Sequence, residues 1–231
     1  MLSLREQKKE ETRRALSRAA AELLLTEGTE NMTVAAIAEK AGVSTRTFHN
    51  YFPRREDALL LFIEDTLDDW CRQVEDAPED EHPLDTMHRL IGDRLSDGTH
   101  PEDAPENPGT LLNLMTIGDH LSAVAGVKEK ARVQHVADGL LEALYRRPGH
   151  GMSRPGVALL LISSLAAGAL AVEPARQNSS TAECGSIPPW TWPSSGPQDA
   201  PSRLEESFRL LRAGFGGKPT PGTTLNRPEP A

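Results

Sequence analysis

The sequence predicts an all-α protein in which a small N-terminal helical unit precedes a larger helical body. Three observations favour this fold class. Apolar residues recur at helical spacing in successive segments, capping residues and glycines mark the ends of those segments, and stretches rich in proline, glycine and acidic residues separate them. The 231 residues suffice for a small domain followed by a larger one.

The N-terminal unit begins with a helix predicted over residues 10–27, which ends at Gly28. Its inward-facing stripe consists of Leu16, Ala20, Leu23 and Leu24. A second, short helix follows Thr33, whose hydroxyl can cap the free N–H groups of the first turn. This helix ends at Gly42, because glycine adopts the left-handed backbone conformation at little cost. Its buried stripe consists of Val34, Ile37, Ala38 and Ala41.

A third helix opens at Ser44, another N-cap, and continues to about Phe52, before Pro53. Phe48 and Phe52 are four residues apart, so both are expected to point into the core. Two short helices joined by a tight turn can place polar side chains in the major groove of double-stranded DNA. The hydrogen-bonding side chains expected on the exposed face are Thr45, Arg46, His49 and Asn50.

The body begins with a fourth helix over residues 54–75, which we expect to join the two parts of the chain. Glu56 and Asp57 lie in its first turn, where carboxylates interact favourably with the positive end of the helix dipole. Further helices are predicted over residues 84–95, 109–119, 127–145, 154–172 and 202–215.

Acidic and proline-rich segments separate these helices. Residues 77–83 form an acidic linker, and residues 96–108 are rich in Asp, Glu, Pro and Gly. Residues 173–201 contain six prolines, so we predict a long flexible or functional loop. Ser202 and Glu205 then form a capping box for the last helix, whose stripe consists of Leu204, Phe208, Leu211 and Phe215.

Several short segments occur in a fixed order near the start of the chain: AAAELL at 19–24, EG at 27–28, MTV at 32–34, IA at 37–38, AGVS at 41–44 and TFHNYFPRREDAL at 47–59. In this combination, residues 12–61 resemble the DNA-binding domain of the TetR family of bacterial transcriptional regulators. Three positions differ from the usual pattern of that family. Thr29 stands where an aromatic residue is usual, His49 where tyrosine is common, and Arg55 where lysine is common.

The resemblance implies a ligand-responsive repressor that binds a pseudo-palindromic operator as a homodimer. It also implies two kinds of DNA contact, since phosphate contacts set the register and base contacts carry sequence information. The residues expected to hold phosphates are Thr33, Tyr51 and Arg55, and those expected to read bases are Thr45, Arg46 and His49. Thr47 and Asn50 can do either, and Ser44 completes the expected DNA-contacting set.

The resemblance further implies a small-molecule effector that binds among the middle helices and moves the fourth helix. The body contains few aromatic residues and many Leu, Ala and Val, so such a pocket would be mainly aliphatic. Its candidate lining residues are Trp70, Leu112, Met115, Tyr145 and Leu161, each of which can equally be an ordinary core residue. The expected domains are 1–53 for DNA binding, 54–215 for ligand binding and dimerisation, and 216–231 as a disordered tail.

One apolar segment permits two interpretations. Residues 155–172 contain no charged side chain, and this length is at the lower limit for a membrane span. Serines and glycines lower the hydrophobicity of the segment. A helix that is apolar nearly all round is also typical of a bundle interior or a subunit interface. We therefore expect no membrane span, and we predict a dimer formed through residues 154–172 and 202–215.

The distribution of charge and the number of cysteines narrow the possible functional classes of the protein. The net charge is −9, yet residues 1–55 contain ten Lys or Arg against seven Glu, whereas the remaining residues contain 15 against 27 acidic residues. A basic N-terminal unit on an acidic body is typical of a DNA-binding protein. Two cysteines make no disulfide framework, and the N-terminus becomes charged too early for a signal peptide, so we expect a cytoplasmic protein.

Motifs for catalysis and metal binding are missing from the sequence. The histidines are scattered, and there is no phosphate-binding glycine loop, nucleophile elbow or zinc-ligand spacing. We therefore expect no enzyme activity, no metal and no cofactor. Two alternatives remain open: an interaction module that kept this fold without DNA binding, and a helical carrier or enzyme that uses the body cavity for small-molecule binding or turnover.

Overall fold

The computed structural model describes residues 3–96, 108–124, 126–178 and 199–214. All regular secondary structure in these residues is helical, as the sequence predicts. The helices are α1 (Leu4–Asn31), α2 (Val34–Lys40), α3 (Thr45–Tyr51), α4 (Arg55–Glu75), α5 (Pro83–Ser96), α6 (Leu111–Val124), α7 (Val127–Arg146), α8 (Arg154–Asn178) and α9 (Ala200–Ala213).

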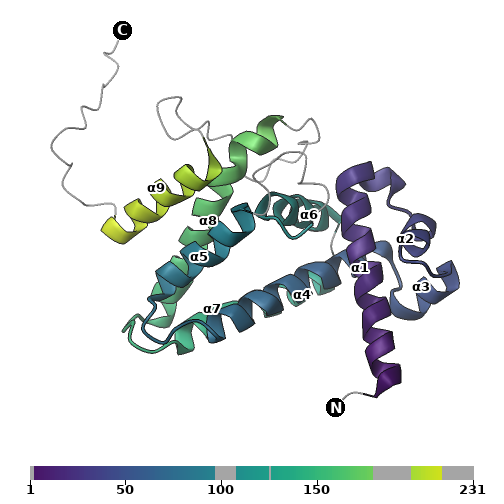
Figure 1. The fold of residues 1–231 in the computed structure, drawn as a ribbon, viewed down its shortest axis with the longest axis horizontal. Coiled ribbons are helices and arrows are strands. Elements are labelled where there is room, and N and C mark those ends of the chain that lie inside the picture. The colour runs from purple at the N-terminus through teal and green to yellow at the C-terminus, as the bar shows by residue number, and fades with distance from the viewer. Residues whose placement is uncertain (1–2, 97–107, 125, 179–198, 215–231) are drawn as a thin grey trace, which may run out of the picture.

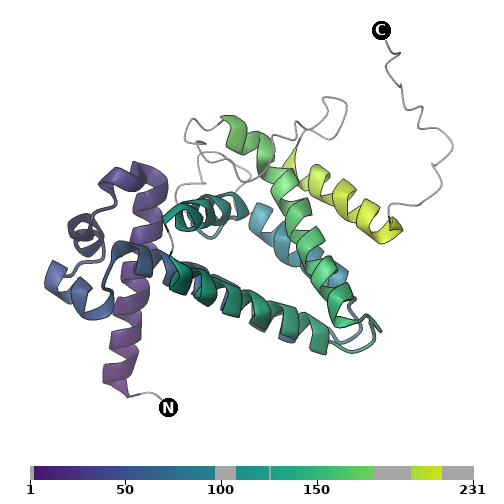
Figure 2. The same cartoon turned by 180° about the vertical axis from the view of Figure 1, so that it is seen from behind.

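Two parts are visible in the fold (Figures 1 and 2). Helices α1–α3 form the N-terminal unit at one end of the molecule, and α4–α9 form the body. α4 runs from the N-terminal unit into the body, where it lies side by side with α7. At the other end of the body, α9 packs on α5 and α8. The long helix α4 therefore belongs to both parts.

Two hydrophobic clusters correspond to these parts. The N-terminal cluster is built on Leu16, Ile37, Phe48, Phe52 and Leu59, which are all almost fully buried. The body cluster joins α4, α5, α7, α8 and α9, and its largest members include Trp70, Met87, Ile91, Leu140, Leu161 and Phe208. Burial of these apolar side chains supplies the main stabilisation of each part.

The connection between α4 and α5 is fixed by a buried arginine. Arg147 follows α7, and its guanidinium donates hydrogen bonds to the carbonyl oxygens of Val74, Ala77, Pro78 and Glu81. These four carbonyls lie at the end of α4 and in the linker after it. A single side chain thus holds the acidic linker against the end of α7.

Several helix boundaries differ from the predicted ones; α6, for example, ends at Val124 instead of residue 119. α1 begins at Leu4 because Ser3 and Glu6 form a capping box, and it continues past Gly28, whose φ of 78° makes a kink. α8 extends to Asn178, beyond the predicted end at residue 172. The predicted capping box at Ser202 is wrong, because Asp199 caps α9 by accepting the N–H of Ser202 at 2.9 Å.

Several predictions fall outside the described residues. These are most of the loop expected over residues 96–108, the central part of the loop expected over residues 173–201, Phe215, and the tail 216–231.

Candidate nucleic-acid interface

Hydrogen bonds within a few residues of one another form the turn between α2 and α3. Thr33 caps α2, since its hydroxyl accepts the N–H of Ala36 at 3.1 Å. Gly42 adopts the left-handed conformation, with φ at 70°, and allows the chain to turn. Ser44 caps α3 by accepting the N–H of Thr47 at 3.1 Å. Both caps and the glycine turn are as predicted.

Burial of one face of α3 determines which side chains reach solvent. Phe48 is fully buried, and Phe52 beyond the end of the helix is 3% exposed; their ring centroids are 5.7 Å apart. Because helical residues four apart share a face, the intervening polar residues lie on the other side. The exposed side chains are Thr45, Arg46, His49 and Asn50, as predicted.

Four further residues of the predicted DNA-contacting set lie at the edge of this face. Tyr51 is half-buried against the N-terminal cluster. The hydroxyls of Ser44 and Thr47 lie 2.9 Å apart and hydrogen-bond to each other. They can therefore hold the start of α3 rigid as well as approach DNA. Thr33 is exposed at the start of α2.

Arg55 has an internal role that the sequence did not predict. Its Nη1 donates to the carbonyl oxygens of Thr29, at 2.8 Å, and Met32, at 3.0 Å, and its Nε donates to Glu56 at 2.9 Å. The half-buried guanidinium thereby fastens the start of α4 to the chain between α1 and α2. Sequence patterns give no signal for such contacts, because the acceptors are backbone carbonyls 26 and 23 residues away.

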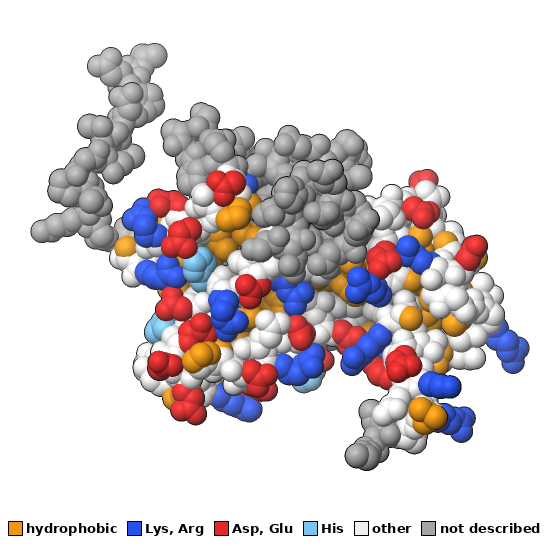
Figure 3. Space-filling view, viewed as in Figure 1, with side chains coloured by type: hydrophobic (Ala, Val, Ile, Leu, Met, Phe, Trp, Pro, Cys, Tyr) orange, Lys and Arg blue, Asp and Glu red, His pale blue; other side chains and the backbone are white. Residues whose placement is uncertain are grey.

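Charged side chains of both signs cover the body on the face drawn in Figure 3, and the N-terminal unit on the right carries basic groups at its outer edge. Within the described residues, no three His, Cys, Asp or Glu side chains are grouped so that they could hold a metal ion.

The predicted effector-pocket residues do not form one site. Trp70 and Leu161 are buried in the body cluster, and Leu112 and Met115 pack against it. Tyr145 is 40% exposed and lies near His150, with ring centroids 6.3 Å apart. Trp70 Nε1 is a buried donor without a hydrogen-bond partner among the described residues.

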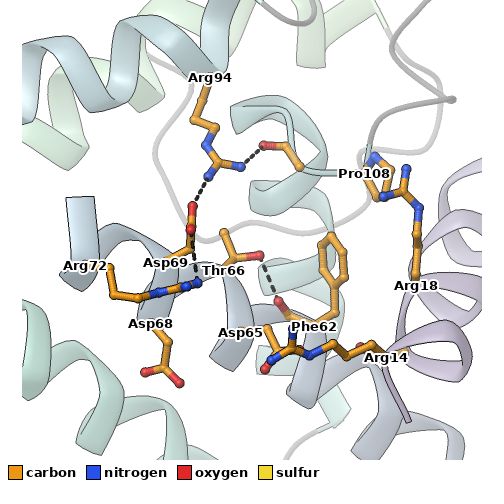
Figure 4. A pocket seen from close by; sticks show the side chains of 12 residues that line it. Arg14, Arg18, Phe62, Asp65, Thr66, Asp68, Asp69, Arg72, Arg94 and Pro108 are labelled. Atoms are coloured by element: carbon orange, nitrogen blue, oxygen red, sulfur yellow. Dashed lines mark hydrogen bonds and ion pairs between the residues drawn. The ribbon is translucent and has the colours of Figure 1, made fainter. Parts of the chain in front are cut away.

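A polar pocket of about 730 Å³ lies instead where α1, α4 and α5 meet (Figure 4), and none of the five predicted residues lines it. Asp69 occupies its wall and accepts hydrogen bonds from Arg72, Gln73 and Arg94. Arg94 also donates to the carbonyl of Gly109. The charged side chains of Asp69, Arg72 and Arg94 in the pocket wall are therefore paired with one another. The pocket is a polar boundary between the N-terminal unit and the body.

The family comparison concerns the segment that contains this interface. Residues 16–61 match the sequence model of the bacterial regulatory proteins of the tetR family. These residues span most of α1, all of α2 and α3, and the first turns of α4. This chain carries a TetR-family DNA-binding domain. The TetR-type domain therefore includes every residue of the predicted DNA-contacting set.

A curated relative and two solved structures extend the comparison. The HTH-type transcriptional regulator TcmR of Streptomyces glaucescens is 37% identical over 98 residues, which are 41% of this chain and 43% of TcmR. The match thus spans less than half of that relative's length.

Solved structures resemble the TetR-type domain together with the body. FadR of Thermus thermophilus, a TetR-family repressor solved with lauroyl-CoA, has a TM-score of 0.50 and 20% identity, over 92% of this chain and 99% of FadR. FadR of Bacillus subtilis, solved with stearoyl-CoA, has a TM-score of 0.58 and 13% identity, over 87% and 97%. At these identities the two structures show that the fold is shared.

The internal contacts of Arg55 predict a stability effect that a phosphate contact alone would not give. Arg55→Lys keeps the positive charge but loses the fork that binds two carbonyls, so the free energy of unfolding should fall by about 1–2 kcal/mol. Urea denaturation measures this difference. Arg46→Lys, at an exposed position in α3, is the control and should leave stability unchanged. Equal stability of Arg55→Lys and wild type would mean that the carbonyl contacts contribute nothing.

Proposed function

We propose that this protein is a transcriptional repressor that binds a pseudo-palindromic operator as a homodimer and releases it when a small molecule binds the body. The exposed polar face of α3, held over buried Phe48 in a TetR-type domain, carries this proposal. A short capped helix with such a face has the size and chemistry to enter a major groove.

The proposed contacts divide into two groups by position. Arg46 and His49 project from the exposed face of α3 and are assigned with Thr45 to base edges. Thr33 and Tyr51, at the margins of that face, are assigned to phosphates. Arg55 is assigned to a phosphate as well, through donors that its two carbonyl partners leave available, since a guanidinium carries five N–H groups. Ser44, Thr47 and Asn50 support either group.

The surface of α8 supports the proposed dimer. Judged by length and composition alone, residues 154–172 could cross a membrane, and 39% of this segment is buried in the protomer. Its outer face leaves Leu159 66% exposed, Ile162 65% and Leu165 39%. An exposed apolar stripe of this kind on one helix is typical of a protein–protein interface. We assign the stripe to the partner subunit rather than to lipid because the chain fold is that of TetR-type regulators.

One part of the predicted interface needs correction. Phe208 of α9 is fully buried within the protomer, where its ring stacks on His88 with centroids 4.5 Å apart. Its replacement would therefore disrupt the body cluster instead of separating two subunits. Leu210, which is 38% exposed on the same helix, is the better candidate for contact with a partner.

The body cluster supports an effector with an apolar part. Its members are mostly aliphatic, and the unpartnered Nε1 of Trp70 offers one buried hydrogen-bond donor. A few polar groups in an apolar lining are typical of small-molecule sites. The two FadR structures carry acyl-CoA ligands, so lauroyl-CoA is the first probe to use.

Removal of one base contact tests the DNA-binding proposal. The probe is a duplex that the wild-type protein selects from random-sequence DNA. Arg46→Ala should weaken binding to this duplex by about 1–3 kcal/mol, the usual contribution of a good base contact, and should weaken binding to random DNA less. Gel shifts at fixed salt measure both affinities, with Arg146→Ala on α7 as the control. Equal losses on both DNAs would assign Arg46 to a phosphate, and failure of the wild type to select any duplex would favour a module without DNA binding.

A charge on the exposed stripe of α8 tests the dimer. Ile162→Glu places an unpaired carboxylate in the proposed interface, which is unfavourable because burial disfavours its charged form. The variant should remain folded and become monomeric in sedimentation or light scattering, because Ile162 is exposed in the single protomer. Leu4→Glu makes the same kind of exchange at a residue that is 70% exposed on α1 and should stay dimeric. A dimeric Ile162→Glu variant would place the interface elsewhere.

Tryptophan emission tests the effector site. The variant Trp190→Phe/Trp192→Phe leaves Trp70 as the last of the three tryptophans. Lauroyl-CoA should change its emission, free CoA should do so less, and further replacement by Trp70→Phe should weaken binding by about 0.5–1.5 kcal/mol. The affinity of that last variant is measured by calorimetry. Unchanged emission with lauroyl-CoA would exclude this ligand from the surroundings of Trp70.

A further inference from the structure

α6 follows the body helix α5 in sequence, but part of it packs in the N-terminal cluster. Ile117 is fully buried there, and Leu121 is 6% exposed; both contact the cluster that contains Phe48 and Leu16. Apart from α4, α6 is the helix through which the body enters this cluster within the described residues. A displacement of α6 would therefore disturb the N-terminal cluster, where α6 packs against α1 and α4.

A polar contact accompanies this packing. His120 lies on α6 between the two buried residues, and its Nδ1 is 3.3 Å from the hydroxyl oxygen of Thr29. Thr29 follows Gly28, the kink at the end of α1. His120 thus reaches the corner at which the chain leaves α1 and turns toward α2.

The same corner is bound from a second side. The backbone carbonyl of Thr29 accepts a hydrogen bond from Arg55, which also binds the carbonyl of Met32, the residue immediately before the α2 cap Thr33. One short path therefore leads from His120 through Thr29 and Arg55 to the start of α2. Each step is a direct contact.

The environment of His120 favours the neutral ring. Its Nε2 is buried and has no partner among the described residues. Burial lowers the pKa of His120 below its ordinary value of 6.5; the carboxylate of Glu56 opposes this shift and the guanidinium of Arg55 reinforces it. The other group that faces the ring is the uncharged hydroxyl of Thr29 on α1.

We propose that His120 is a positioning residue: through its contact with Thr29, α6 of the body holds the α1–α2 corner and thereby sets the placement of the DNA-reading helices. This inference deepens the proposed function by naming the contact through which the body acts on α2 and α3. Thr29 supplies the partner hydroxyl at a position where the TetR family usually has an aromatic ring, so the contact belongs to this chain's own sequence.

Hydrogen exchange tests the coupling without DNA. Thr29→Val removes the hydroxyl and keeps the shape of the side chain, while His120→Leu removes the ring nitrogens and keeps an apolar group. Both variants should accelerate amide exchange in residues 28–52 by about fivefold, as loss of one net hydrogen bond implies. The control His135→Leu replaces an exposed histidine on α7 and should leave these amides unchanged. Unaltered exchange in both test variants would overturn the proposal, even if the protein binds DNA as proposed.

Operator affinity gives the second measurement, with the duplex that the wild-type protein selects. Each single variant should weaken binding by about fivefold, and the double variant should be no weaker than the weaker single one, because both remove the same contact. His120→Asn places a hydrogen-bonding group near the Nδ1 position and should recover most of the affinity. Additive losses in the double variant would overturn the proposed contact.

The pH dependence separates positioning from simple packing. Because the pKa of His120 is lowered in the docked state, the docked state is fully favoured above the ordinary value of 6.5 and loses stability as the pH falls below it. Wild-type affinity should therefore fall relative to that of His120→Asn as the pH decreases from neutral to about 5.5. The ratio of the two affinities at each pH cancels every pH effect that the two proteins share. A ratio independent of pH would overturn the role of the His120 ring.

Discussion

Burial of Phe48 is the constraint on which the rest of the interface depends. Once this ring and Phe52 are fixed in the N-terminal cluster, the rotation of α3 about its axis is determined. Arg46 and His49 must then face solvent. Thr33 fixes where α2 begins, the left-handed Gly42 follows its end, and Ser44 fixes where α3 begins, so the polar face has a defined position as well as a defined direction.

Two helices connect this face to the body, and they do so in different ways. α4 contributes Leu59 to the N-terminal cluster and Trp70 to the body cluster, so one continuous helix joins the two clusters. α6 enters the N-terminal cluster with Ile117 and brings His120 against the α1–α2 corner. A change in the body can therefore reach α2 and α3 through packing and through a hydrogen-bonded path, and this double link is what the proposed release mechanism requires.

The body has two apolar surfaces that serve different proposed purposes. The inward surface of α8 packs in the body cluster through Leu161, and the guanidinium of Arg203 secures α9 to the carbonyl of Ala171 at 2.8 Å. The outward surface presents Leu159 and Ile162 to solvent in the protomer. Because the two sets of residues lie on one helix, the proposed effector site and the proposed dimer interface share α8.

The sequence by itself determined those features that arise from interactions within a few residues. The N-caps at Thr33 and Ser44, the turn at Gly42 and the burial of Phe48 and Phe52 follow from local hydrogen bonds and helical spacing, and all were predicted. The boundary of α9 was missed because two plausible caps lie close together, and Asp199 is used in place of Ser202. The tertiary structure alone decided the partners of Arg55, the contact of His120 with Thr29, and the packing of Phe208 within its own protomer instead of in a subunit interface. These contacts join segments far apart in the chain, and their acceptors are often backbone carbonyls, which have the same chemistry in every residue and leave no pattern in the sequence.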